Sequence, residues 1–180
     1  HGFESTPEFN AFRRNIYNSN KPNESNFDTN EAFQTAMYYW LNVNVPLSYN
    51  YWVNKKDYHL ENAVHELMTK MGYAVNYTEH NYDNGVDLRA WIGEENLSIQ
   101  CKGTNRVGPA IIRETVGVRV MENDTFSHQI QEDVNVVVVC PRGCTAQYKY
   151  LAEKHKVLLV DAHDLCAAYR GESNPFCFNN

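Results

Sequence analysis

A chain of 180 residues, 43% of them hydrophobic, is long enough to bury one core without the help of disulfides. The formal net charge of −6 argues against a protein that coats nucleic acid by bulk electrostatics, whereas an acidic chain can still hold a metal-dependent hydrolytic site. No apolar run approaches the ~20 residues that span a bilayer, so we expect no membrane segment.

The cysteines are odd in number and widely separated, which favours reduced thiols over a disulfide framework. We therefore expect a cytoplasmic, reducing setting, with an organellar or nuclear location left open. A zinc site is a weaker interpretation, because the spacing of its candidate ligands matches no tight structural pattern and a core cysteine explains the first of them better. Those candidates are Cys140, Cys144, His155, His163 and Cys166.

Residues 1–56 differ in composition from the rest, with many Asn, Tyr and Phe residues and few aliphatic ones, and we treat them as an appendage. Asp28 and Glu31 resemble a capping box for one helix near 29–42. We expect the appendage to select the target, although it could instead cover the core or a dimer partner. Its candidate phosphate contacts are Arg13, Arg14, Lys21, Lys55 and Lys56.

From Tyr58 onward the pattern is sharper. Apolar residues at three- and four-residue spacing predict a helix from Tyr58 that stops at Gly72. Alternating residues then predict a strand over 73–77, and a turn at 81–85 precedes a second strand over 86–92. A hairpin turn at 93–96 leads into a third strand over 97–102.

The second half alternates helices with apolar strands. After a loop over 103–109 we expect a helix at 110–121, a buried strand at 136–139, a helix at 145–155 and a buried strand at 157–160. Asp161 can cap a last helix that runs to Tyr169. The order predicts an α/β domain over 57–172 with a mixed sheet and helices on both faces, followed by a tail over 173–180.

The third strand places two candidate site residues on one face. Side chains two residues apart on a strand point the same way, so Gln100 and Lys102 project together. Asp87 lies on the partner strand of the same hairpin. A carboxylate, an amide oxygen and an ammonium at one edge suit phosphodiester hydrolysis with a divalent ion, although a solvated surface hairpin explains the spacing equally well.

Several motifs resemble one family in order and spacing. They are Leu60-Glu61-Asn62-Ala63-Val64-His65-Glu66-Leu67, Met71-Gly72-Tyr73, Gly85-Val86-Asp87-Leu88, Ile99-Gln100-Cys101-Lys102, Ile112-Arg113-Glu114 and Val157-Leu158-Leu159-Val160-Asp161. Together they cover residues 58–170 and resemble the catalytic domain of Mrr-type restriction endonucleases, a branch of the PD-(D/E)xK nucleases that commonly has Gln in place of Glu. The fold implied is a restriction-endonuclease-like three-layer sandwich.

The resemblance also implies roles for the four residues. Asp87 would be the principal metal ligand, Gln100 a second ligand through its amide oxygen, and Glu61 a further metal or water contact. Lys102 would orient or activate the attacking water. The cofactor expected is Mg²⁺ or Mn²⁺, held loosely because Gln100 contributes no charge.

The activity implied is endonucleolytic hydrolysis of DNA, in defence or DNA processing. Members of the family often have a basic and an aromatic residue after the lysine, where this chain has Gly103 and Thr104. We therefore expect that a backbone contact near the site is either lost or moved to Arg106. Arg89 and Arg113 are further candidate contacts to DNA. Alternatives are a catalytically silent nucleic-acid-binding module and an RNA- or junction-specific nuclease. Whether two copies pair as a homodimer is open.

Overall fold

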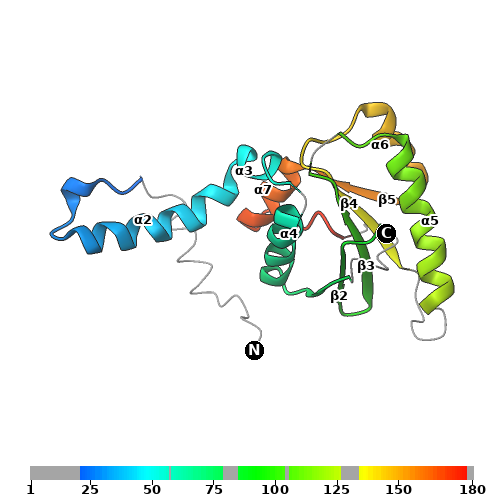
Figure 1. Cartoon of the computed structure of the whole chain (residues 1–180), viewed down its shortest axis with the longest axis horizontal. Helices are drawn as coiled ribbons and strands as arrows, with labels where there is room; N and C mark the ends of the chain where they lie inside the picture. Colours follow the sequence, from blue (N-terminus) through cyan, green and yellow to red (C-terminus); the bar gives the residue numbers. More distant parts are fainter. Residues whose placement is uncertain (1–20, 57, 79–84, 104–105, 127–133, 178–180) are drawn as a thin grey trace.

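The structure is a computed structural model that describes residues 21–56, 58–78, 85–103, 106–126 and 134–177 (Figure 1). The turn expected at 81–85 lies almost wholly outside these residues, as do Arg13 and Arg14. The helical elements are η1 (Glu24–Asn26), α2 (Asn30–Asn44), η2 (Val45–Leu47), α3 (Tyr49–Val53), α4 (Tyr58–Lys70), α5 (Pro109–Phe126), α6 (Ala146–Lys154) and α7 (Ala162–Arg170). The strands are β1 (Ala74–Tyr77), β2 (Leu88–Ile92), β3 (Glu95–Cys101), β4 (Asn135–Val139) and β5 (Val157–Val160).

The sheet is mixed and its five strands follow chain order, β1-β2-β3-β4-β5. The first three strands are antiparallel, with Leu88 opposite Ile99 in the β2–β3 hairpin. β3, β4 and β5 run parallel, with Gln100 opposite Val138. Parallel neighbours require a crossover on a face of the sheet, and α5 and α6 provide these crossovers. The predicted α/β, restriction-endonuclease-like sandwich is confirmed.

The helices divide between the two faces of the sheet. α3, α4 and α7 cover one face, and α5 and α6 cover the other (Figure 1). Alternation along β4 separates the two cores, because Val137 and Val139 pack toward α4 while Val136 and Val138 pack toward α5. Each face therefore has its own apolar layer, and a strand residue's position decides which helices it meets.

Local signals in the sequence explain both ends of α7 and the start of α2. Asp161 caps α7 in a capping box with Asp164, and Gly171 ends it in a left-handed conformation with φ of 73°. The expected cap at Asp28 is wrong: α2 begins after Thr29, whose hydroxyl accepts a hydrogen bond from the Ala32 N–H at 3.2 Å. Thr29 satisfies the free N–H of the first turn one residue later than Asp28 could.

Two core residues lie outside the domain range expected from the sequence. Trp52 in α3 is 1% exposed, packs in the core on the α4 face, and donates from Nε1 to the Pro46 carbonyl at 2.7 Å. Phe176 is fully buried and packs against the Tyr73 ring in an edge arrangement. α3 and the segment after α7 therefore share the core of the sheet, whereas α2 extends away from it (Figure 1).

Candidate active site

Asp87 lies where the β2–β3 hairpin opens toward the rest of the sheet. It directly precedes β2, and continuing the register by one residue places it opposite Gln100. Its backbone N–H donates to the Ile99 carbonyl at 2.8 Å, and its Oδ2 accepts the Cys101 N–H at 2.6 Å. A hydrogen bond from a backbone N–H to a carboxylate fixes the side chain in one orientation. Asp87 is thus held against β3, one residue from Lys102.

Lys102 follows the last residue of β3 and is anchored through its backbone. Its N–H donates to the Val139 carbonyl of β4 at 2.8 Å, so the end of β3 is fixed to the central parallel strand. The side chain is half-buried, which leaves the ammonium able to meet solvent or a substrate.

Glu61 approaches from α4. The helix buries Leu60, Val64 and Leu67 against the sheet, and Glu61, next to Leu60, is left half-buried at the flank of this apolar stripe. It lies in the first turn, where a carboxylate is also favoured by the helix dipole.

Three of the four predicted site residues affect the pKa of the Cys101 thiol. Burial raises its pKa well above the ordinary value, the negative charges of Asp87 and Glu61 raise it further, and the positive charge of Lys102 lowers it. Coulombic effects of this kind require proximity. Asp87, Glu61 and Lys102 therefore each lie within electrostatic range of the Cys101 thiol at the end of β3.

Gln100 is placed differently from what a ligand role would suggest. It is 2% exposed and faces α5, where its Nε2 donates to Glu114 Oε1 at 3.2 Å and its Oε1 accepts the Thr115 hydroxyl at 3.2 Å. A Cβ added to Gly85 would lie 2.9 Å from Glu114 Oε1 and 3.1 Å from Gln100 Nε2. The loop before Asp87, the end of β3 and α5 thus meet at this amide.

Glu114 and Thr115 are the site-proximal residues that sequence reasoning did not single out. The signal was available in part, since Ile112-Arg113-Glu114 belongs to the matched motif. The predicted DNA contacts are dispersed: Arg89 is half-buried on β2, whereas Arg106 and Arg113 are exposed, the latter on α5 beside Glu114.

The carboxylate and amide oxygens match the ligand type of Mg²⁺ and Mn²⁺. Among the residues that the structure describes, no group of three or more His, Cys, Asp or Glu side chains is arranged to hold a metal ion. A catalytic magnesium needs less, because one or two protein carboxylates together with waters and substrate phosphates complete its shell. Asp87 and Glu61 are sufficient in number for that arrangement.

The zinc interpretation gains no support. Cys140 is 1% exposed, and burial, followed by its electrostatic interactions with Cys144 and Asp161, raises the pKa of its thiol to about 12. A protonated, buried thiol is a poor zinc ligand, since the metal binds the thiolate. Cys140 is a core residue, as its position at the end of an apolar strand predicts.

A family model described as restriction endonuclease, the Mrr catalytic domain, matches residues 54–169, more than half of the chain. The chain belongs to the Mrr restriction endonuclease family. The match covers every element from α4 to β5, all of α7 except Arg170, and the four predicted site residues of this Mrr domain. No curated protein and no solved structure matches the chain. None of the helices in the described ranges combines the length and hydropathy that a bilayer-spanning segment requires.

Proposed function

We propose that this Mrr domain is a DNA endonuclease that hydrolyses phosphodiester bonds with Mg²⁺ or Mn²⁺ at the end of the β2–β3 hairpin. The observation that carries the proposal is the Asp87 carboxylate, fixed by the Cys101 N–H at 2.6 Å beside Lys102 and near the charge of Glu61. Two carboxylates and one ammonium at a sheet edge form a suitable set of groups for cleaving a phosphate diester.

The divalent ion would be held by Asp87 and Glu61 and would supply charge neutralisation at the phosphate and a more acidic water. The protein's own groups would do the rest. Hydrolysis joins a water oxygen to phosphorus and breaks one P–O bond to the sugar, so a proton must leave the water and the departing oxygen must gain one. The Lys102 ammonium would hold the attacking water and offset negative charge on the phosphate oxygens.

Gln100 has two proposed roles that differ in outcome. The resemblance implies a metal ligand through Oε1, whereas the contacts to Glu114 and Thr115 support a role in fixing β3 to α5. An amide oxygen has two lone pairs, so the bond from Thr115 leaves one acceptor position on Oε1. Substitution of Gln100 distinguishes the two roles, as argued in the Discussion.

The DNA substrate and the cellular compartment also belong to this proposal. A silent nucleic-acid-binding module would have no reason to keep the Asp87 and Lys102 arrangement, which favours an enzyme. All five cysteines are free, which supports the reducing compartment expected from their spacing. Pairing of two copies to cut both strands stays a proposal.

The direct test incubates the full chain with plasmid, modified plasmid, single-stranded DNA and RNA, each with Mg²⁺, Mn²⁺ or EDTA. The proposal expects cleavage of at least one DNA substrate with a divalent ion and none with EDTA. Cleavage of RNA alone would support the RNA nuclease. Binding to DNA without cleavage in any metal would support the silent module.

A further inference from the structure

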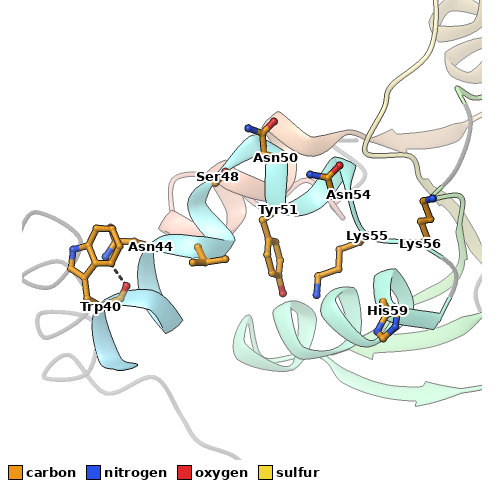
Figure 2. Close-up of a pocket in the computed structure, with 10 residues that line it drawn as sticks. Trp40, Asn44, Ser48, Asn50, Tyr51, Asn54, Lys55, Lys56 and His59 are labelled. Carbon is orange, nitrogen blue, oxygen red and sulfur yellow. Dashed lines mark hydrogen bonds between the residues drawn. The ribbon is translucent and has the colours of Figure 1, made fainter. Parts of the chain in front are cut away.

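A groove of about 760 Å³ lies beside the candidate active site, between the end of α2, the η2–α3 segment and the first turn of α4 (Figure 2). It is lined by Trp40, Asn44, Val45, Ser48, Asn50, Tyr51, Asn54, Lys55, Lys56 and His59. Most of these residues precede the match to the Mrr family, which begins at residue 54. The groove therefore lies partly outside the family match, and none of the four candidate catalytic residues lines it.

The charge of the lining is opposite to that of the chain. The whole protein has a formal net charge of −6, yet the ten lining residues include Lys55, Lys56 and His59 and no carboxylate. The Lys55 ammonium lies 4.4 Å from the centroid of the Tyr51 ring, and Lys56 is exposed. Local cations in an acidic protein concentrate anions at the place where they gather. The groove is thus suited to a negatively charged ligand.

Aromatic and amide groups complete the lining. Figure 2 shows Tyr51 on α3 and Lys55 just after it projecting toward α4, whose first turn contributes His59, while Trp40 and Asn44 lie at the α2 end. Flat aromatic rings stack on nucleobases whatever their identity, and asparagine amides can bond to base edges. A ligand with negative charge, a flat ring and hydrogen-bonding edges is a nucleotide.

The groove starts at the catalytic edge of the sheet. A Cβ added to Gly103 would lie 2.6 Å from the Lys55 carbonyl oxygen and 2.9 Å from Lys56 Cα, so the backbone of these two lysines lies directly against the residue after Lys102. Lys55 and Lys56 therefore lie on a backbone segment that neighbours the end of β3 and Lys102.

We infer that the groove binds an unpaired stretch of the DNA strand next to the phosphate that is cut, with phosphates at Lys55 and Lys56 and a base against Trp40. The position of the cut phosphate rests on the proposed nuclease function. Duplex DNA would offer the groove only its phosphates, because its base faces are already stacked on one another. The aromatic lining can be used only by an unstacked base, so the groove prefers a single strand.

The test measures binding in EDTA, where cleavage cannot interfere, by fluorescence anisotropy of a labelled oligothymidine and of the same strand in a duplex. The full chain is compared with Lys55→Met/Lys56→Met, Trp40→Ala and Trp40→Phe. A matched control, Lys154→Met/Lys156→Met, removes two exposed lysines at the end of α6 and just beyond it. Melting temperatures establish that each variant is folded, and Lys56→Met alone replaces the pair if the pair is not.

The double variant Lys55→Met/Lys56→Met, called the groove pair, should bind the single strand about 5- to 30-fold more weakly than the parent, the effect of losing modest charge contacts. It also reduces the slope of log affinity against log salt by about 1.4, because each phosphate contact on a single strand contributes about 0.7. Trp40→Ala weakens binding, Trp40→Phe largely restores it, and the control pair behaves as the parent does.

Equal affinity of the groove pair and the control pair for the single strand would overturn the inference, as would an unchanged affinity in Trp40→Ala. The same preparation, tested with plasmid and Mg²⁺, separates this result from the proposed function. If the parent cleaves DNA and the groove variants bind as the parent does, the groove inference is wrong and the nuclease function stands. If the groove variants bind more weakly but the parent does not cleave, the nuclease function is wrong and the groove inference stands.

Discussion

The carbonyl oxygen of Lys55 lies 2.6 Å from the position that a Cβ on residue 103 would occupy. Any side chain at this position would push apart the backbone before α4 and the end of β3. A basic residue after Lys102, as the family resemblance leads us to expect, has no room here, because the segment before α4 fills that space. Gly103 is therefore the point where the segment before α4 packs against the candidate site.

Gly103→Ala should destabilise the fold by about 1–3 kcal/mol, the usual cost of forcing atoms into a filled space. Chemical denaturation measures this change. Gly117→Ala is the matched control, because a Cβ at this exposed position in α5 meets nothing within 4 Å and alanine favours a helix over glycine. If Gly103→Ala were as stable as Gly117→Ala, the close approach of Lys55 would not exist in solution.

Gln100→Glu distinguishes the two roles of Gln100. In the arrangement seen here it places a buried carboxylate about 3.2 Å from that of Glu114, and the like charges should cost about 1–3 kcal/mol at neutral pH. Repulsion raises the pKa of the pair in the folded state above its unfolded value. The loss of stability should therefore appear above the unfolded pKa, near pH 4 to 5, grow as the pH rises through the folded pKa, and be absent in acid.

The double variant Gln100→Glu/Glu114→Gln is the control for that experiment. It restores one amide and one carboxylate in exchanged positions and should recover most of the lost stability, as urea denaturation at pH 7.5 can measure. A ligand role predicts something different: Gln100→Glu would keep its stability and lower the metal concentration for half-maximal cleavage. The contacts to Glu114 and Thr115 favour the first result.

Lys102→Met should reduce the cleavage rate by about 10²- to 10⁴-fold, the range for removing a group that handles the attacking water. The fold should persist, because the side chain is half-buried and methionine preserves its apolar stem. Single-turnover cleavage at saturating DNA separates this loss from weaker binding. A rate within a few-fold of the parent would exclude Lys102 from the chemistry.

A chain that starts at Lys56 should be poorly folded. It lacks Trp52, which is 1% exposed in the core, and loss of such a side chain costs about 3–5 kcal/mol. A chain that starts at Asn44 keeps α3 and the Pro46 carbonyl that accepts from Trp52, and it should unfold cooperatively. Comparing the melting curves of the two chains locates the N-terminal boundary of the folded domain. Equal stability of both chains would support the boundary after residue 56 that the sequence predicts.

The periodic parts of the fold could be predicted from the sequence because each signal is local. The repeat from Leu60 to Leu67 sets α4, and the valine run of β4 sets a strand buried on both faces. α3 was missed because it has only five residues, and nothing local shows that its Trp52 enters a distant core. Contacts of this kind depend on tertiary packing.

Local sequence signals predict one part of the candidate site and not the other. The period of two along β3 correctly separates Gln100 from Ile99 and Cys101, but it carries no information about which helix covers each face. The burial of Gln100 against Glu114 and Thr115 follows from the path of α5 after β3, which the strand pattern does not contain. The approach of Lys55 to Gly103 likewise joins segments 48 residues apart in the sequence.

Asp87→Asn tests the central claim most directly. Asparagine keeps an oxygen that can accept the Cys101 N–H, so the hydrogen bond at the end of β3 survives while the charge that would hold the metal is removed. The measurement is plasmid cleavage by parent and variant over a range of Mg²⁺ concentrations, with EDTA as the blank and equal melting temperatures as the folding control. The account predicts Mg²⁺-dependent cleavage by the parent and none by the variant, and cleavage by folded Asp87→Asn at the parent's rate would contradict it.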